Sequence, residues 1–274
     1  MKTHRLIFGP YYARITGLAL LGTIAVGADA AAQVAVLGST QEERITAPGQ
    51  TYTGSITVLN GSDEEQNVRI YQTDYMFFAD GRSPLDAPGT NPRSNAAWVK
   101  PSATTLRIAP RSQAMVLYEV SVPADSTLRG SYWSTIMIEP LRDVRAINRR
   151  GAVGVGSTVR YAVQIASHIS NTGSRTVTFP RTQLVADSAG TPTLEVDVEN
   201  GGGRAYRPLL WVEVYDAEGT LRAKMQQLRG LLYPGSSLRQ RFALGALGPG
   251  AYKAILYADT GEESVFASEL RLEL

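Results

Sequence analysis

Hydrophobic and polar residues alternate along most of the chain, in short segments separated by Gly, Pro, Asn and Asp. A period of two is typical of β-strands with one buried face, and the segments are rich in the Val, Ile, Thr and Tyr that favour strands. In the first half of the chain, the predicted strands cover residues 51–59, 67–75, 105–109, 114–122, 130–140 and 155–169. Helical spacing is nearly absent, so the pattern predicts an all-β protein.

Two of these segments, 51–59 and 67–75, flank the sequence Asn60-Gly61-Ser62-Asp63. Asn and Gly tolerate the positive φ angles that tight hairpin turns require. The two strands are therefore expected to pair as a hairpin.

The second half repeats the pattern, with predicted strands at 182–186, 193–200, 209–221, 237–244, 251–259 and 266–274. Within 209–221, residues 215–219 predict a hairpin turn with Gly219 in the left-handed position, and Trp211, Glu213 and Tyr215 on one face. Strands at this spacing without helices between them predict antiparallel sandwiches. We therefore expect two immunoglobulin-like β-sandwich domains in tandem, with a break near residues 171–174.

The N-terminus has the pattern of an export signal. Lys2, Arg5 and Arg14 precede an uncharged stretch of 14 residues, 15–28, which small residues follow. A spanning helix needs about 20 apolar residues, so cleavage after Ala30 or Ala32 is favoured over an uncleaved anchor. The expected organisation is a signal peptide at 1–32, a first domain at 33–170 and a second at 171–274, in the periplasm or outside the cell.

Composition narrows the function classes. Hydrophobic residues make up 43% of the chain and charged residues 19%, which predicts a folded protein. The part after residue 32 has 24 basic and 24 acidic residues, a balance that argues against nucleic-acid binding. The chain has no cysteine, which excludes disulfides and thiolate chemistry.

The sequence contains few residues in patterns that support catalysis. His168 is the single histidine after the leader and is expected to be an exposed strand residue rather than a catalytic base. Glu195, Asp197 and Glu199 alternate with apolar residues, which predicts an acidic strand face that is either solvated or a weak calcium site. Asp74, Asp80 and Asp86 surround the loop 80–95 without the spacing of a cation site. The sequence thus predicts a protein that is not an enzyme and has no cofactor or metal.

The segment 142–169 carries the strongest sign of binding. Its first part is basic, with Arg142, Arg145, Arg149 and Arg150, and its second part is the alternating strand 155–169. An exposed strand edge can add to the sheet of another protein through backbone hydrogen bonds. The predicted partner-binding residues are these four arginines together with Val159, Arg160, Tyr161, Val163 and Ile165. The alternative is that the apolar residues face their own core and the arginines belong to a solvated loop.

A second candidate site is aromatic. Tyr75, Phe77, Phe78 and Trp98 lie around the loop 80–95, where they either hold a ligand or pack as core residues and loop anchors.

The order of these parts resembles the periplasmic pilus chaperones of the PapD type. The similarity rests on residues 49–60, on Trp98 to Pro101 followed by Leu106, Ile108 and Pro110, and on residues 130–140. The resemblance implies that the strand 155–169, entered through the basic segment, lends apolar residues to a pilin subunit. It also implies a basic pair, in the cleft between the domains, that holds the carboxylate of the subunit, with Arg160 and Arg44 as the corresponding residues.

The opening of the first domain, residues 46–75, also resembles the immunoglobulin-like domain of WxL-interacting surface proteins. That resemblance implies binding to peptidoglycan or to a surface protein. The sequence thus predicts a chaperone-like or surface-assembly accessory whose partner is an exported subunit. The alternatives are a cell-envelope binding module and a hydrolase that uses the acidic strand face.

Overall fold

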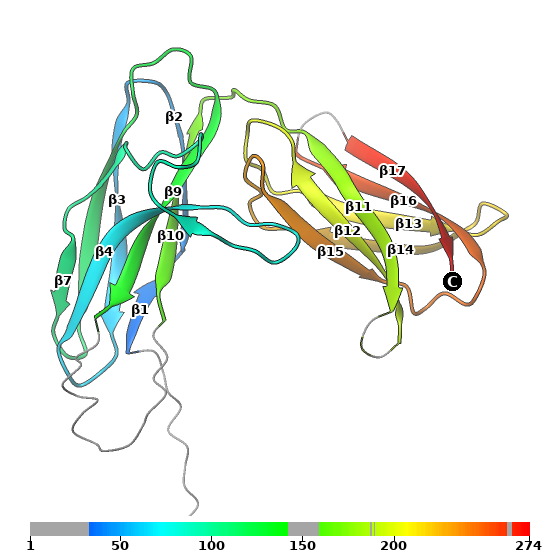
Figure 1. Ribbon diagram of the computed structural model, residues 1–274, viewed down its shortest axis with the longest axis horizontal. Helices are drawn as coiled ribbons and strands as arrows, with labels where there is room; N and C mark the ends of the chain where they lie inside the picture. Colours follow the sequence, from blue (N-terminus) through cyan, green and yellow to red (C-terminus); the bar gives the residue numbers. More distant parts are fainter. Residues whose placement is uncertain (1–32, 142–158, 187, 189, 262–264) are drawn as a thin grey trace, which may run out of the picture. The chain divides into compact units, whose positions relative to one another are not determined.

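The computed structural model describes residues 33–141, 159–186, 188, 190–261 and 265–274, and every regular element within them is a strand (Figure 1). The expected all-β fold of two immunoglobulin-like sandwiches is confirmed. The predicted signal peptide at 1–32 lies outside the described residues. Both sandwiches belong to one compact unit, Ala32–Leu274, and the domain boundary at residue 170 stays a prediction.

Two sheets form the first sandwich. One has the strand order β1 (Val34–Leu37), β3 (Thr51–Asn60), β8 (Gln113–Ser121) and β6 (Val99–Pro101). The other has the order β2 (Gln41–Thr46), β10 (Tyr161–Ile169), β9 (Gly130–Pro140), β4 (Gln66–Tyr75) and β5 (Leu85–Asp86), and β7 (Thr105–Ile108) also pairs with β4. All pairings in these two sheets are antiparallel except that of β2 with β10, which is parallel.

The core of the first sandwich follows from the alternation in the sequence. Inward residues of β3 and β8, such as Val58 and Val120, pack with Ile136 of β9 and Val163 of β10. Their neighbours along β3 and β8 point outward, as the period of two requires, whereas the neighbours of Ile136 on β9 are buried as well. Apolar burial from both sheets therefore holds the layers together.

The predicted hairpin of β3 with β4 is wrong, because the two strands lie in different sheets. Asn60 is fully buried, and its Nδ2 donates to the carbonyl oxygens of Glu64 (2.7 Å), Ile108 (3.1 Å) and Ala109 (3.0 Å). Its Oδ1 accepts a hydrogen bond from the N–H of Ser62 at 2.9 Å. The Asn-Gly pair thus begins a crossing between sheets, where the Asn side chain satisfies backbone groups that would otherwise be unpaired.

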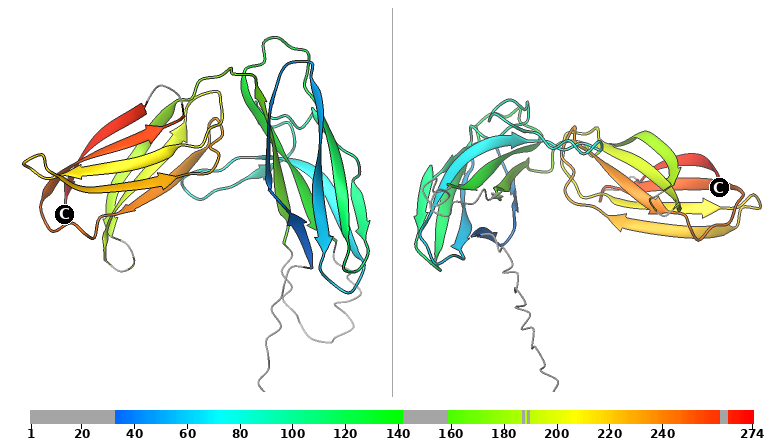
Figure 2. Two further views of the ribbon diagram at one scale, coloured as in Figure 1. Left: turned by 180° about the vertical axis from the view of Figure 1, so that it is seen from behind. Right: turned by 60° about the horizontal axis from the view of Figure 1, so that its bottom comes forward.

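The second sandwich also has two sheets. One has the order β11 (Val177–Ala186), β12 (Pro192–Asn200) and β15 (Ser237–Ala243), and the other β14 (Leu221–Leu228), β13 (Leu209–Tyr215), β16 (Ala251–Asp259) and β17 (Val265–Glu273). The two views of Figure 2 show these strands as two facing layers. The predicted hairpin turn between β13 and β14 is confirmed, and Gly219 has a φ of 80°.

Asn200 repeats the role of Asn60 at the end of β12. It is fully buried, and its Nδ2 donates to the carbonyl oxygens of Arg204 (2.8 Å) and Leu232 (2.9 Å). Its Oδ1 accepts from the N–H of Gly202 at 2.9 Å. The same device therefore ends corresponding strands in both halves of the chain.

A third apolar cluster joins residues from the two halves of the compact unit. Trp133 of β9 is fully buried and stacks on Tyr233, with ring centroids 4.5 Å apart. The indole Nε1 of Trp133 donates to the carbonyl oxygen of Tyr75 at 2.7 Å. At Gly130, where φ is 77°, an added Cβ would lie 1.8 Å from the carbonyl oxygen of Gly203. Any residue other than glycine at position 130 is therefore excluded on both steric and conformational grounds.

Candidate functional site

The strand β10 has one edge that is only partly covered. Its whole length pairs with β9, whereas β2 pairs with Gln164–Ile169 alone. The N–H groups of Gln164 and Ser170 donate to the carbonyl oxygens of Thr40 (2.8 Å) and Thr46 (2.7 Å), so even-numbered residues direct their backbone groups toward β2. The direction of the backbone N–H and C=O groups alternates from residue to residue along a strand. The N–H and C=O of Ala162 therefore face the side on which β2 lies, but Ala162 precedes the first residue that pairs with β2. Among the described residues, Tyr161–Val163 therefore form an open strand edge.

The edge is open because the chain crosses from one sheet to the other between β1 and β2. β1 pairs with β3 in one sheet, whereas β2 pairs with β10 in the other. Gly38, between them, has a φ of 89°, which lets the chain turn away from β10 before residue 41. Leu37, beside the crossing, and Val159, just before β10, are apolar and exposed, at 39% and 47% of their surface.

Five of the nine predicted partner-binding residues lie among the described residues, and their exposure differs. Val163 and Ile165 are 0% and 1% exposed and belong to the core of the first sandwich, so these two side chains face their own domain and are not available to a partner. Tyr161 is partly buried against the same core, while Val159 and Arg160 are exposed. Partner contact by the exposed residues stays a prediction.

The four arginines at 142, 145, 149 and 150 lie outside the described residues, as do residues 155–158 of the predicted strand. The basic segment thus remains a prediction from the sequence.

The structure does not bring Arg160 and Arg44 together. Arg44 of β2 pairs in register with Ser167, and its guanidinium lies 5.5 Å from the ring centroid of Tyr52. Arg160 lies seven residues before Ser167, which is about 23 Å along a strand. The expectation of a basic pair made of these two residues is therefore wrong.

His168 is buried instead of exposed, with 6% of its surface accessible. Its Nδ1 lies 2.7 Å from the Oγ of Ser131, and its Nε2 lies 3.2 Å from the Oε2 of Glu43. The Oγ of Ser131 already accepts a hydrogen bond from the N–H of Ala205 at 2.8 Å, so its own proton is free to go to Nδ1. In that arrangement Nε2 carries the ring proton and donates to Glu43. Ser131 is fully buried, so its hydroxyl is not accessible to a substrate as a nucleophile.

Glu43 also pairs with Arg207, whose Nη1 lies 3.2 Å from Oε2 and whose Nη2 binds Oε1. Burial raises the pKa of Glu43, but hydrogen bonds from His168 and Arg207 and the charge of Arg207 outweigh it and hold the pKa at about 2. The adjoining hollow, of about 540 Å³, is rimmed by Arg175 and Arg204, whose guanidinium groups bind backbone carbonyls of Thr260 and Ser170. Sequence reasoning missed this cluster, because β2 is polar and shows no clear alternation.

Glu43 is expected to make the protein sensitive to acid. Since its folded pKa of about 2 lies below the unfolded value of 4.5, its contribution is complete above pH 4.5 and is lost as the pH falls toward 2. The Glu43→Gln variant keeps the side-chain shape but lacks this contribution. The free energy of unfolding, measured in urea at several pH values, should differ most between the two proteins above pH 4.5. A difference that stays constant down to pH 2 would contradict the assignment.

The acidic face of β12 is not solvated. Glu195 and Asp197 are 6% and 8% exposed, because arginines from neighbouring strands cover them. Arg239 binds both oxygens of Asp197, at 2.7 and 2.9 Å, and Arg241 binds Glu195 at 2.7 Å. Each of these two carboxylates thus has a guanidinium partner, so neither is free to act as the calcium ligand that the sequence suggested. In the described ranges, no three His, Cys, Asp or Glu side chains are grouped to hold a metal ion.

The aromatic residues near the long loop are packed. Tyr75 and Phe77 lie against the cluster that contains Trp133 and Tyr233. Trp98 packs on Tyr132 with ring centroids 4.8 Å apart. The guanidinium carbon of Arg82 lies 5.0 Å from the ring centroid of Phe78. The alternative of core residues and loop anchors is therefore the better description.

Within the residues that the structure describes, no helix has the length and apolar character needed to cross a membrane. No family model matches the sequence, and a search of curated proteins also found no match.

Several solved structures resemble the chain in fold, and most of them are described as chaperones. A chain from a chaperone–tip adhesin complex of CFA/I fimbriae biogenesis is 9% identical, with a TM-score of 0.47, over 87% of this chain and 98% of that one. The class 5 fimbriae chaperone CfaA is 10% identical, with a TM-score of 0.45, over 86% and 98%. The CupB2 chaperone of Pseudomonas aeruginosa is 12% identical, with a TM-score of 0.38, over 86% and 98%. At these identities the likeness concerns the fold alone.

Proposed function

We propose that the protein is an exported, non-enzymatic accessory of surface assembly that binds a β-rich protein subunit by strand addition at β10. The observation that carries this proposal is the open edge at Tyr161–Val163, which β2 leaves uncovered on the side that the Ala162 backbone faces. Backbone groups at such an edge can pair with an incoming strand without loss of a native hydrogen bond.

The surroundings of the edge support the same function. Val159 is exposed, and Leu37 lies at the end of the crossing chain, so apolar surface is available next to the unpaired backbone. The side chains of Val163 and Ile165 stay in their own core, so the backbone supplies most of the binding and the side chains near residue 159 supply selectivity. The predicted export signal and the basic segment 142–151 fit an accessory that acts in the periplasm on exported subunits.

The test compares two variants at Ala162, whose backbone N–H faces the open edge. Ala162→Pro removes this N–H. A strand tolerates proline only where the backbone N–H has no hydrogen-bond partner, which is the case at an open edge. Ala162→Val keeps the N–H and has a β-branched side chain suited to a strand. Tagged proteins spanning 33–274 are incubated with envelope extract of the source cells, and the bound proteins are identified by mass spectrometry.

The wild type and Ala162→Val are expected to retain the same β-rich subunit, and Ala162→Pro to bind it at least about fivefold more weakly. Thermal unfolding checks that both variants are folded. Equal capture by the two variants would place the binding surface elsewhere, and failure of the wild type to retain any β-rich subunit would count against the proposal as a whole.

A further inference from the structure

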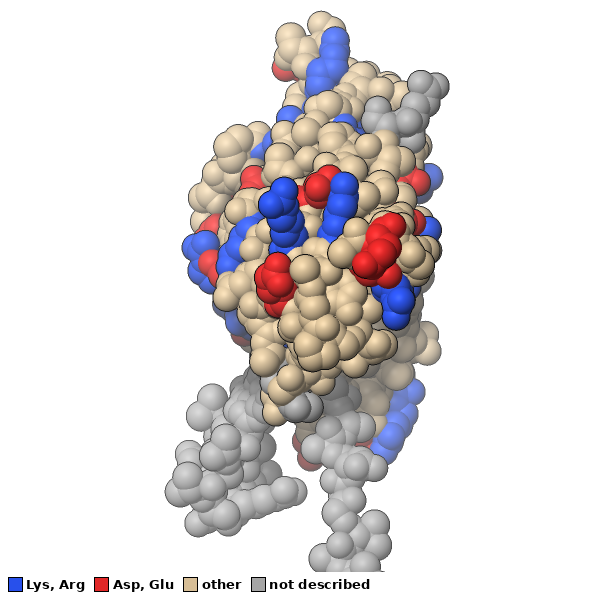
Figure 3. All heavy atoms as spheres, turned by 90° about the vertical axis from the view of Figure 1, so that its right-hand side faces the viewer, with Lys and Arg blue, Asp and Glu red and all other residues tan. Residues whose placement is uncertain are grey.

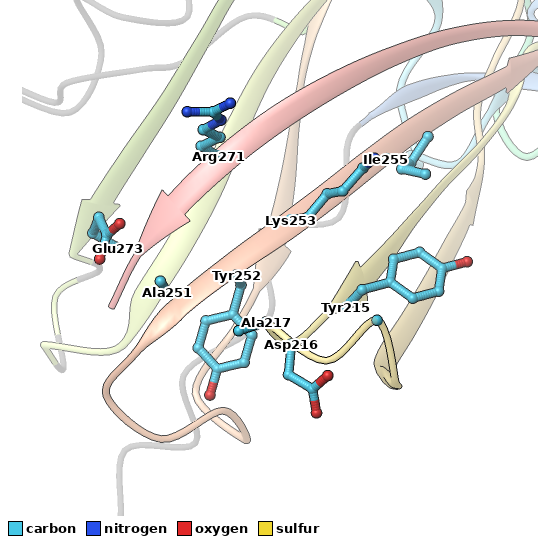
Figure 4. A pocket seen from close by; sticks show the side chains of 10 residues that line it. Tyr215, Asp216, Ala217, Ala251, Tyr252, Lys253, Ile255, Arg271 and Glu273 are labelled. Atoms are coloured by element: carbon cyan, nitrogen blue, oxygen red, sulfur yellow. The ribbon is translucent and has the colours of Figure 1, made fainter.

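A shallow groove of about 570 Å³ lies on the outer face of the sheet β14-β13-β16-β17. Its side chains come from the end of β13, from the following turn, and from β16 and β17 (Figure 4). Tyr215, Lys253 and Arg271 form one row across three strands, since Lys253 pairs in register with both of the others. The groove is independent of the β10 edge and serves no purpose in the function proposed above.

The row holds two cations where a sheet would normally avoid them. Like charges directly opposite each other on neighbouring strands are destabilising, because their Cβ atoms are only about 5 Å apart. Lys253 is partly compensated by Glu269 at 2.8 Å, with both side chains about half exposed. Arg271 pairs with no carboxylate among the described residues. Local rules are broken at functional sites more often than elsewhere, and an acidic group beside Arg271 would relieve the repulsion that Glu269 leaves uncompensated.

The same groove also contains two carboxylates, Asp216 and Glu273. Asp216 lies 3.6 Å from Arg222, which is a loose pair, and Glu273 is exposed. Basic and acidic side chains are interspersed across the end of the molecule that Figure 3 faces, without a large patch of one sign. A small anion such as phosphate gains from the cations but is repelled by these carboxylates. A ligand with several hydroxyl groups and one acidic group can use both kinds of side chain.

Apolar surface continues the groove along β13 and β16. Ile255 and the ring of Tyr215 line it. Further along the same face, Trp211 and Tyr257 form a stacked pair with ring centroids 4.9 Å apart. Aromatic rings beside polar side chains suit the apolar face of a sugar ring together with its hydroxyl groups.

We propose that this groove binds an acidic saccharide. The carboxylate of the sugar lies between Lys253 and Arg271, its ring lies against Tyr215, and its hydroxyl groups donate to Asp216 and Glu273. Successive sugars extend toward Trp211 and Tyr257.

The test is a calorimetric titration of the purified protein with a galacturonic acid trisaccharide, a neutral galactose trisaccharide and inorganic phosphate. Arg271→Gln is compared with Lys100→Gln, which removes one exposed charge from β6 in the other sandwich. The acidic trisaccharide is expected to bind the wild type and Lys100→Gln equally, and Arg271→Gln about tenfold more weakly. Because Arg271 is exposed, its replacement is expected to leave the thermal unfolding midpoint unchanged.

The proposal would be overturned if the acidic trisaccharide did not bind, if the neutral trisaccharide bound equally well, or if both variants lost the same affinity. Binding of phosphate as tight as that of the acidic trisaccharide would also contradict it, since the carboxylates and the aromatic surface would then have no part.

Discussion

The Val163→Asp variant is expected to be unfolded at neutral pH. Val163 is fully buried between the two sheets of the first sandwich, where its neighbours include Ile136 and Ile165. An aspartate at this position has neither water nor a cation to stabilise its charge, so the free energy of unfolding should fall by at least about 4 kcal/mol. Circular dichroism and urea unfolding measure the loss directly.

The matched control is Val159→Asp, four residues earlier. Val159 is 47% exposed, so a charge there stays in water and the unfolding midpoint should remain close to that of the wild type. A folded Val163→Asp protein would show that this part of β10 does not face its own core. Partner capture by Val159→Asp then reports on the exposed surface next to the open edge.

The Asn60→Asp variant is expected to lose at least about 3 kcal/mol of stability at neutral pH. The substitution is nearly isosteric, but it replaces the Nδ2 donor by an oxygen that faces the carbonyl oxygens of Glu64, Ile108 and Ala109. Three carbonyl oxygens lose their donor and meet a negative charge on a fully buried side chain, and an unsatisfied buried group costs about 1 to 3 kcal/mol. Urea unfolding at neutral pH provides the measurement.

Asn67→Asp serves as the control, because Asn67 is exposed on β4. It changes the net charge in the same way and should have little effect on the free energy of unfolding. If the two aspartate variants were equally stable, the buried amide of Asn60 would not hold the crossing between the sheets. Asn200→Asp is expected to resemble Asn60→Asp, since Asn200 makes the corresponding bonds in the second sandwich.

The sequence predicted those elements whose signal is local. The alternation of apolar residues predicted β8 closely, because one face of this strand is buried and the other is exposed. The strands β9 and β10 were also predicted, although β9 and the second half of β10 are buried on both faces. Gly219 predicted the turn between β13 and β14, since a single residue with positive φ is enough to define it.

The failures involve partners that lie far away in the sequence. Asn60 and Gly61 were predicted to form a hairpin turn, but two of the carbonyl groups that Asn60 binds belong to residues 108 and 109. His168 is buried because Ser131 and Glu43 contact it, and its own strand gives no sign of that. The acids of β12 looked solvated because their arginine partners, Arg239 and Arg241, lie on β15.

The open edge of β10 could be anticipated only in part. The sequence indicated the strand and its possible role in binding, but the extent of the edge depends on β2, which is polar and was not predicted. The alternation of Val159, Tyr161, Val163 and Ile165 suggested one continuous binding face. The structure divides it, because the side chains of Val163 and Ile165 enter the core of their own sandwich while the unpaired backbone of Ala162 remains outside.

The most direct test of strand addition is residue-resolved amide hydrogen exchange on β10, measured with and without the captured subunit. Strand addition predicts slower exchange of the Ala162 amide when the subunit is bound, while the Val163 amide, which faces β9, is unchanged. Unchanged exchange at Ala162 in a complex that is otherwise intact would contradict binding at this edge.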